Sequence, residues 1–196
     1  MSPGSSRTRT RNVFEPLSAS EVAQPWQSRF GIPEDVFSGY QFFRKAKSIW
    51  AISDAPLPRL SFESLGMRIM NIKDRPWKPT TCALQVFGKH ATRNLVHLDE
   101  EQARLFLEGG TQVIGPDMKL DLAPESAFDP EPASDSTSYQ VFDLASDQAS
   151  DPVSGPMPGY VVVFYRGEVL GCGLYSHGKL ISQIPKERRA GEQPGR

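Results

Sequence analysis

Apolar residues recur at helical spacing near the start of the chain, where Val22, Trp26 and Phe30 would share one face of a helix. Ser18 stands three residues before Glu21, which is the pattern of a capping box at a helix N-terminus. We therefore expect a helix that begins near Ser18. Comparable patterns predict further helical segments at residues 33–37, 80–87 and 99–109.

Short runs rich in β-branched and aromatic residues, bounded by Gly or Pro, predict β-strands. They lie at residues 41–44, 48–53, 66–73, 95–98, 113–114, 160–165, 169–175 and 179–184. The first two would form a hairpin with Arg44–Lys47 at its tip, and the last three a β-meander joined by Arg166-Gly167 and His177-Gly178. Helices and strands in this arrangement indicate an α+β fold.

Three parts of the chain are poor in apolar residues. We expect a disordered basic arm at residues 1–17, a flexible acidic insertion at 121–158 and a disordered tail at 190–196. The folded parts would then be an α/β segment, residues 18–90, and a β-rich part, residues 91–189, that carries the insertion.

The formal net charge of −1 conceals an uneven distribution of charge. Residues 121–165 contain eight acidic residues and no Lys or Arg, whereas residues 40–93 contain ten basic and three acidic residues. A basic folded part favours binding to a polyanion, because neutralising phosphates supplies most of the affinity that does not depend on sequence.

Catalytic and metal-binding patterns are missing from the sequence. There is no Gly-rich phosphate loop between a strand and a helix, and Cys82, His90, His97 and Cys172 lack the short spacings typical of zinc sites. Both cysteines are interpreted as small buried hydrophobic residues, and Gly171-Cys-Gly173 as a strand bulge or a close backbone approach. We therefore expect no enzymatic activity, no cofactor and no metal.

Membrane and secretory patterns are missing as well. The sequence contains no uncharged apolar run of about 18 residues and no apolar segment of the secretory type near its start. We expect a cytoplasmic protein with no membrane partner.

Basic residues interleaved with aromatic ones remain as candidate chemistry. Cations neutralise phosphates and aromatic rings stack on unpaired bases, so such a mixture suits RNA. The alternative is that the basic residues only solvate loops and that Trp77 packs inward, and composition does not decide between the two. The candidate RNA-binding residues are Arg44, Lys45, Lys47, Arg75, Trp77, Lys78, Lys89, Arg93, Tyr175, Lys179, Lys186, Arg188 and Arg189.

Several segments, taken in order, resemble a known RNA-binding module. They are Leu65-Gly-Met-Arg-Ile, Trp77-Lys-Pro-Thr-Thr, Leu95-Val-His-Leu-Asp-Glu-Glu-Gln-Ala, Phe106-Leu-Glu-Gly, the stretch from Gly159 to Gly173, Gly178-Lys-Leu and Ile184-Pro-Lys-Glu-Arg-Arg. Together they resemble the PUA-type domain at the C-terminus of Sun/RsmF-type rRNA 5-methylcytosine methyltransferases, in a stand-alone, archaeal-like layout. The segment from Phe30 resembles the α/β region that precedes such domains.

This resemblance implies a pre-PUA α/β segment at residues 18–90 and a PUA-like mixed β-barrel at residues 91–189. It implies RNA contacts near residues 93–98, at the Gly109-Gly110 loop and at the basic C-terminal end. The family's catalytic half is not recognisable here, since Thr81-Cys82 matches its catalytic motif by letters only.

The resemblance predicts a non-catalytic protein that binds structured rRNA or tRNA in RNA modification or ribosome maturation. In this role the protein would also have a separate RNA methyltransferase as a partner. The alternative prediction is a protein-interaction adaptor that docks an RNA methyltransferase or a ribosomal protein and does not contact RNA itself.

Overall fold

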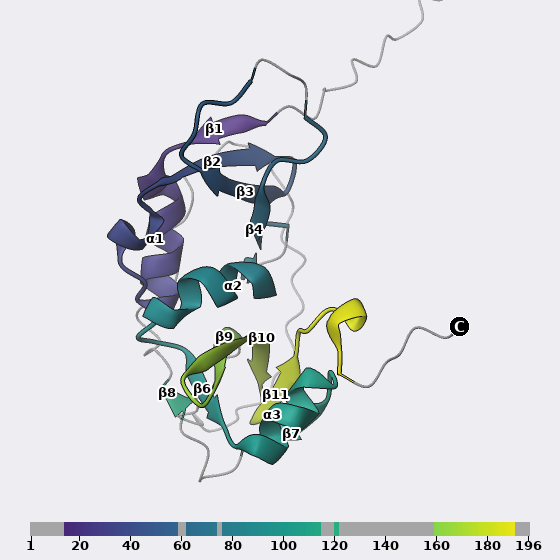
Figure 1. Ribbon diagram of the computed structural model, residues 1–196. Coiled ribbons are helices and arrows are strands. Elements are labelled where there is room, and N and C mark those ends of the chain that lie inside the picture. Colours follow the sequence, from purple (N-terminus) through teal and green to yellow (C-terminus); the bar gives the residue numbers. More distant parts are fainter. Residues whose placement is uncertain (1–13, 59–61, 74–75, 115–119, 122–158, 191–196) are drawn as a thin grey trace, which may run out of the picture.

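The structure, a computed structural model, describes residues 14–58, 62–73, 76–114, 120–121 and 159–190. Two β-sheets stand at opposite ends of the molecule, with helix α2 between them and helix α1 along one side (Figure 1). In chain order the elements are β1 (Glu15–Leu17), α1 (Ala19–Phe30), η1 (Glu34–Phe37), β2 (Tyr40–Lys45), β3 (Ser48–Ser53), β4 (Met67–Asn71), β5 (Lys78–Pro79), α2 (Thr81–Phe87), η2 (Gly88–His90), β6 (Leu95–Leu98), α3 (Glu100–Leu107), β7 (Thr111–Val113), β8 (Leu120–Asp121), β9 (Gly159–Tyr165), β10 (Glu168–Ser176), β11 (Lys179–Ser182) and η4 (Lys186–Arg188).

The expected capping box begins α1. The Ser18 hydroxyl accepts a hydrogen bond from the Glu21 amide at 3.2 Å, and the Glu21 carboxylate accepts one from the Ser18 amide at 2.8 Å. The Ser18 hydroxyl also donates a hydrogen bond to the Glu21 carboxylate at 2.6 Å, and this bond holds the pKa of the Glu21 carboxyl below its ordinary value. Asp99 and Gln102 form the same reciprocal box at the start of α3.

The first sheet is antiparallel throughout, with the strand order β1-β2-β3-β4-β5. Its β2–β3 hairpin is the expected one, but the strands run on to Lys45 and from Ser48, so only Ala46 and Lys47 form the turn. The expectation that the disordered arm reaches residue 17 is wrong for Glu15–Leu17, which pair with Phe42–Arg44 as β1. Residues 1–13 of the arm lie outside the described residues.

The second sheet is mixed, with the strand order β7-β11-β10-β9-β6-β8. The meander of β9, β10 and β11 is antiparallel, as expected, whereas β6 runs parallel to β9. Helix α3 leads from β6 to β7, which pairs with β11 at the edge of the sheet. Helices beside two sheets confirm the α+β class, and the curled mixed sheet agrees with a PUA-like barrel (Figure 1).

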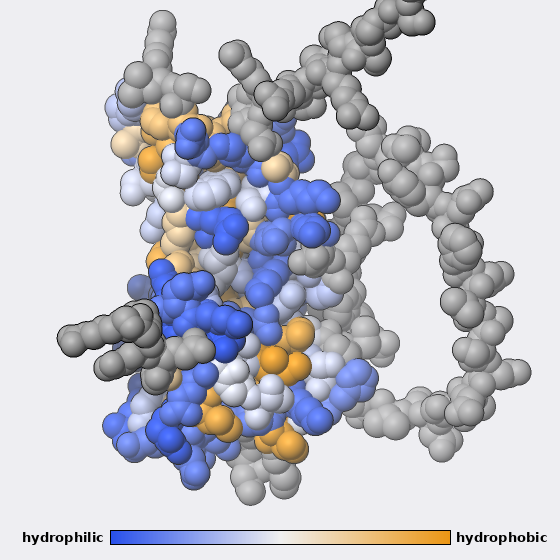
Figure 2. Space-filling view, turned by 90° about the vertical axis from the view of Figure 1, so that its right-hand side faces the viewer, coloured by the Kyte–Doolittle hydropathy of each residue, from blue (hydrophilic) through white to orange (hydrophobic). Residues whose placement is uncertain are grey.

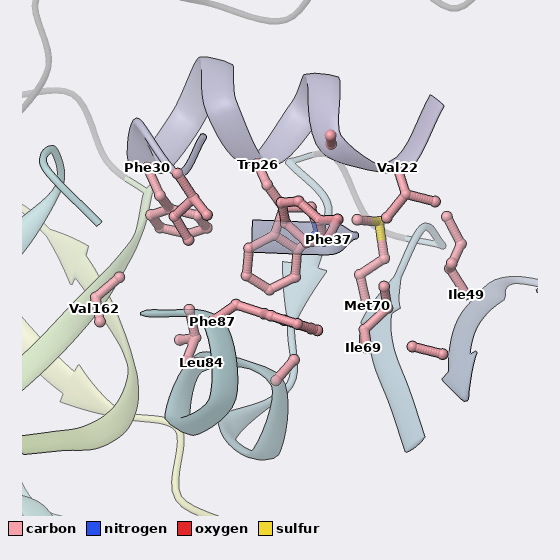
Figure 3. Packing of buried hydrophobic residues seen from close by; sticks show 14 of the residues in the cluster. Val22, Trp26, Phe30, Phe37, Ile49, Ile69, Met70, Leu84, Phe87 and Val162 are labelled. Atoms are coloured by element: carbon pink, nitrogen blue, oxygen red, sulfur yellow. The ribbon is translucent and has the colours of Figure 1, made fainter. Parts of the chain in front are cut away.

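One hydrophobic core joins the two sheets through α2. Trp26 and Phe30 of α1 point toward Phe87 and Leu84 of α2, and Val22 points toward Met70 of β4 (Figure 3). Val162 of β9 belongs to the same cluster, together with buried side chains from β3, β4 and β10. A smaller cluster lies on the other face of β9, under α3, and contains Phe106 and Leu180. Because one apolar cluster spans the expected boundary near residue 90, the two parts are held together by shared packing.

Within the described ranges, no helix has both the length and the apolar character needed to cross a membrane.

Candidate RNA-binding surface

The C-terminal 3-10 helix η4 packs against the turn that follows α3. The Ala190 amide donates to the Leu107 carbonyl at 3.1 Å, and the Arg189 guanidinium donates to the Ile184 carbonyl at 3.4 Å. Gly109, at φ +86°, leaves room for this guanidinium, because a Cβ at that position would overlap it. The Gly109-Gly110 loop and the basic C-terminal end, which are about 80 residues apart in the sequence, therefore lie side by side.

β5 and the start of α2 contribute to the same surface. Lys78 donates from Nζ to the Gln183 side-chain oxygen at 2.6 Å, and its ammonium lies 5.8 Å from the centre of the Tyr160 ring. Arg188 donates from Nη1 to the Cys82 sulfur at 3.0 Å. These contacts bring Lys78 next to the C-terminal end, where Lys186, Arg188 and Arg189 lie within four residues that also include Glu187.

We call this group the C-terminal basic cluster; its members are Lys78, Lys186, Arg188 and Arg189. In the part of the chain that the structure describes, none of the four forms an ion pair with a carboxylate. Lys186 and Arg188 are exposed, and Lys78 and Arg189 are half-buried. Cations held in place but not neutralised are suited to phosphate contacts.

The cations of the β2–β3 hairpin have partners within the chain. Arg44 forms an ion pair with Glu15 at 3.0 Å, and the Lys45 ammonium donates to the Glu63 carbonyl and lies 4.6 Å from the centre of the Phe14 ring. Lys47, in the turn, is exposed. The hairpin is therefore less available to phosphate than its sequence indicates.

Trp77 is only 9 % exposed, so the prediction that it is an exposed stacking residue is wrong. Its ring lies 5.3 Å from that of Trp26 and 5.8 Å from that of Phe30. The buried Arg29 guanidinium lies over the Trp77 ring at 4.9 Å and donates to the Trp77 carbonyl at 2.8 Å. Trp77 packs inward because its ring is removed from water and gains contacts with the aromatic face of α1.

Tyr175 is likewise buried, at 7 % exposure, in the cluster under α3. Side chains alternate between the faces of a strand, and in β10 this alternation points Tyr175 inward. Its assignment as an RNA-stacking residue is wrong for that reason.

The remaining candidates lie apart from the C-terminal basic cluster. Lys89 is exposed in η2, beyond the end of α2, and Arg93 is half-buried and donates to the Gln27 carbonyl at 3.3 Å. Lys179 is exposed at the start of β11, opposite Val113. Arg75 lies outside the described residues. The candidate cations thus fall into several groups, of which the C-terminal basic cluster is the one assembled from distant parts of the sequence.

Figure 2 looks onto the side of the molecule that is on the right in Figure 1, where η4 lies. Hydrophilic residues cover much of this side and are interrupted by separate apolar patches. Such a surface offers many polar contacts and few continuous apolar ones, which suits a charged ligand more than a hydrophobic partner.

The two cysteines differ in their burial. Cys172 is completely buried, and this burial raises the pKa of its thiol from 9.0 to about 12, so the reactive thiolate is suppressed. Cys82 is half-buried, which corrects the interpretation of both as buried hydrophobic residues. Among the described residues, no three side chains of His, Cys, Asp or Glu gather as a metal site would require.

The Gly171-Cys-Gly173 segment has the structural role expected of it. The register between β9 and β10 shifts between Val169 and Gly171, which marks a bulge. A Cβ at Gly171, whose φ is +153°, would lie 2.7 Å from the Thr81 side chain of α2. Gly171 lets α2 sit close to the sheet, and so it helps to place Lys78 and Cys82 beside the C-terminal end.

Gln183 also belongs to this surface, although the sequence analysis did not identify it as a candidate residue. It is half-buried just after β11, and its role depends on the distant Lys78. No local pattern of residues signals such a contact, because the two positions are 105 residues apart.

A family model described as the Methyltransferase RsmF PUA domain matches residues 143–190. No curated protein matches the chain. The matched region ends with the β9–β11 meander and the basic C-terminal end, and it does not reach the upstream segments on which the resemblance also rests. The C-terminal part of the chain therefore carries a PUA-type domain of the Sun/RsmF type.

Proposed function

We propose that this protein binds structured RNA, rRNA or tRNA, through the C-terminal basic cluster, and that it acts without catalysis of its own in RNA modification or ribosome maturation. A PUA-type domain suggests RNA binding, and three of the four members of the cluster, Lys186, Arg188 and Arg189, lie at the end of the matched region. The mechanism is neutralisation of backbone phosphates by side chains that the fold holds in place.

One observation supports this proposal most strongly. Contacts with Gln183 and Cys82 bring Lys78 and Arg188 to one surface, and Lys186 and Arg189 are close to Arg188 in the sequence. In the described part of the chain no carboxylate forms an ion pair with any of the four. Nearby like charges repel one another, so a protein keeps them together when a bound anion compensates.

Filter binding of tRNA and rRNA fragments at several salt concentrations tests the proposal. The triple variant Lys186→Ala, Arg188→Ala, Arg189→Ala should bind more weakly. Its plot of log affinity against log salt concentration should be flatter by at most about 2.7 units, since each lost phosphate contact removes about 0.7–0.9. An unchanged slope would remove these residues from the interface.

A matched control removes the same amount of charge elsewhere. In the triple variant Arg44→Ala, Lys45→Ala, Lys47→Ala, two of the three lost cations already have partners within the chain. We expect a change in slope of about 1 unit or less. Equal changes in the two variants would mean that only overall charge matters.

The adaptor function has one observation in its favour. Val113 is 72 % exposed in β7, which stands at the end of the strand order of the second sheet within the described residues. Exposed edge strands can pair with a partner. A wild-type protein that retains no RNA even at low salt would favour this alternative, and Val113→Asp would then be expected to abolish docking of an RNA methyltransferase.

The absence of catalysis is tested by a separate assay. The purified protein, incubated with RNA and a methyl donor, should transfer no methyl group. Transfer that persists after further purification of the protein would contradict the non-catalytic part of the proposal.

A further inference from the structure

The imidazole of His97 rests on the Phe164 ring. Their centres are 5.2 Å apart and their planes differ by 22°, so the two rings are stacked. Phe164 is 7 % exposed, whereas His97 is exposed. One face of the imidazole is therefore supported by a buried ring, and its outer side is open to solvent.

The fold explains why this pair lies at the surface. His97 and Phe164 are register partners in the parallel β6–β9 pair, and Leu95 and Val162 lie on the same face two residues earlier. Helix α2 and η2 cover that earlier position, since Gly88 sits so close that a Cβ there would be 3.1 Å from Val162. His97 and Phe164 lie two residues further along their strands than this covered position.

Polar and cationic side chains lie along α2 and η2, which lead from the C-terminal basic cluster toward Val162 of β9. Cys82, Gln85 and Lys89 are spaced three and four residues apart, on the side of α2 and η2 that is half-buried or exposed. Cys82 contacts Arg188 at one end, and Lys89 lies next to Gly88 at the other. A seven-residue helix is about 10 Å long, so a single RNA strand can reach both ends.

We propose that His97, supported by Phe164, is a stacking platform for one unpaired base of the RNA. This inference rests on the proposed function and adds the class of substrate: RNA with an unpaired nucleotide near a structured region. Histidine is among the aromatic side chains on which unpaired bases stack, and a ring whose orientation is already fixed loses little freedom on binding. The family resemblance implies RNA contacts near residues 93–98, and the contact with Phe164 adds which side chain of that range offers its ring and to what part of the RNA.

The test uses two RNAs, a hairpin with an unpaired loop and a fully paired duplex, with the full-length protein. His97→Ala should weaken binding of the hairpin roughly 5- to 150-fold, the loss found when a base-stacking residue is truncated. It should leave binding of the duplex unchanged. His97→Phe should restore hairpin binding, because it retains a flat ring.

A base analogue provides a direct readout. The fluorescence of 2-aminopurine in the hairpin loop should be quenched by the wild type and by His97→Phe, and not by His97→Ala. His90→Ala is the matched control, since it removes another exposed histidine, for which no ring contact is found among the described residues. This control should behave as the wild type does.

Two results would overturn the platform. Hairpin binding and quenching unchanged in His97→Ala, with the triple variant of the C-terminal basic cluster still impaired, would disprove the platform and leave the proposed function standing. Equal weakening of hairpin and duplex by His97→Ala would show a structural role in place of stacking. A wild type that binds neither RNA would instead refute the proposed function itself.

Discussion

The β2–β3 hairpin and the C-terminal end are both rich in Lys and Arg, but the fold treats their charges differently. In the hairpin, the Arg44 guanidinium pairs with Glu15 and the Lys45 ammonium lies against a ring and a carbonyl. At the C-terminal end, Arg188 contacts the Cys82 sulfur and no carboxylate in the described part of the chain. Cations that look alike in sequence thus differ in how much charge they can offer to a ligand.

A similar contrast separates two aromatic residues. Trp77, between basic residues in the sequence, is buried against α1, whereas His97 in a β-strand holds its ring at the surface. Neighbouring charge does not place a ring at the surface; the distribution of apolar partners around it does.

The largest expected effect comes from removing the buried ring next to Lys78. Trp77→Ala should lower the free energy of unfolding by about 3–5 kcal/mol, because it leaves a cavity among Trp26, Phe30 and Arg29. Lys78→Ala, the neighbouring surface change, should cost less than about 1 kcal/mol. Urea unfolding of both variants measures the two values, and a Trp77→Ala variant as stable as the wild type would contradict the buried position.

A smaller effect is expected at high pH from Cys172, which lies in β10 beneath α2. Burial raises the pKa of its thiol from 9.0 to about 12, so above pH 9 the unfolded chain loses a proton that the folded chain keeps. The thiol's contribution is complete below pH 9, falls by about 1.4 kcal/mol per pH unit above it, and ends near pH 12. Urea unfolding of the wild type and of Cys172→Ala between pH 8 and about 11 checks this.

Comparing the wild type with Cys172→Ala separates the effect of the thiol from that of all other groups, which both proteins share. The difference in unfolding free energy between the wild type and Cys172→Ala should shrink as the pH rises above 9. A difference that stays constant with pH would mean that the thiol ionises equally easily in both states.

The smallest expected effect comes from Glu15→Gln, which tests how the β2–β3 hairpin differs from the C-terminal end. Glu15→Gln removes the partner of Arg44 and should make RNA binding slightly steeper in its dependence on salt, because a cation is released at the hairpin. The pair is exposed on both sides, so the stability of the protein should change by less than about 1 kcal/mol. Filter binding and thermal unfolding measure the two quantities, and weaker RNA binding in this variant would contradict the account.

Local signals made much of the fold predictable from sequence. The capping boxes at Ser18 and Asp99 mark two helices correctly, because each box depends on residues only three positions apart. The β-meander was predictable for the same reason, since its strands are joined by two-residue turns. The strand β1 was missed because Glu15–Leu17 is too short to show an alternating pattern.

The candidate site was harder to predict, because its contacts join distant parts of the chain. The sequence identified Lys186, Arg188 and Arg189 as basic, but not their approach to Lys78 through Gln183 and Cys82. It also left the orientation of Trp77 open, since the residues that bury it come from α1, about 50 residues earlier. The parallel pairing of β6 with β9, which stacks His97 on Phe164, is equally non-local.

Photo-crosslinking of the protein to bound tRNA or rRNA, followed by identification of the crosslinked peptides, tests the central claim most directly. The account predicts crosslinks in residues 183–190 and in the segment from Lys78 to Lys89, with few in the hairpin around Arg44. Crosslinks concentrated in the hairpin, with none at the C-terminal end, would contradict it.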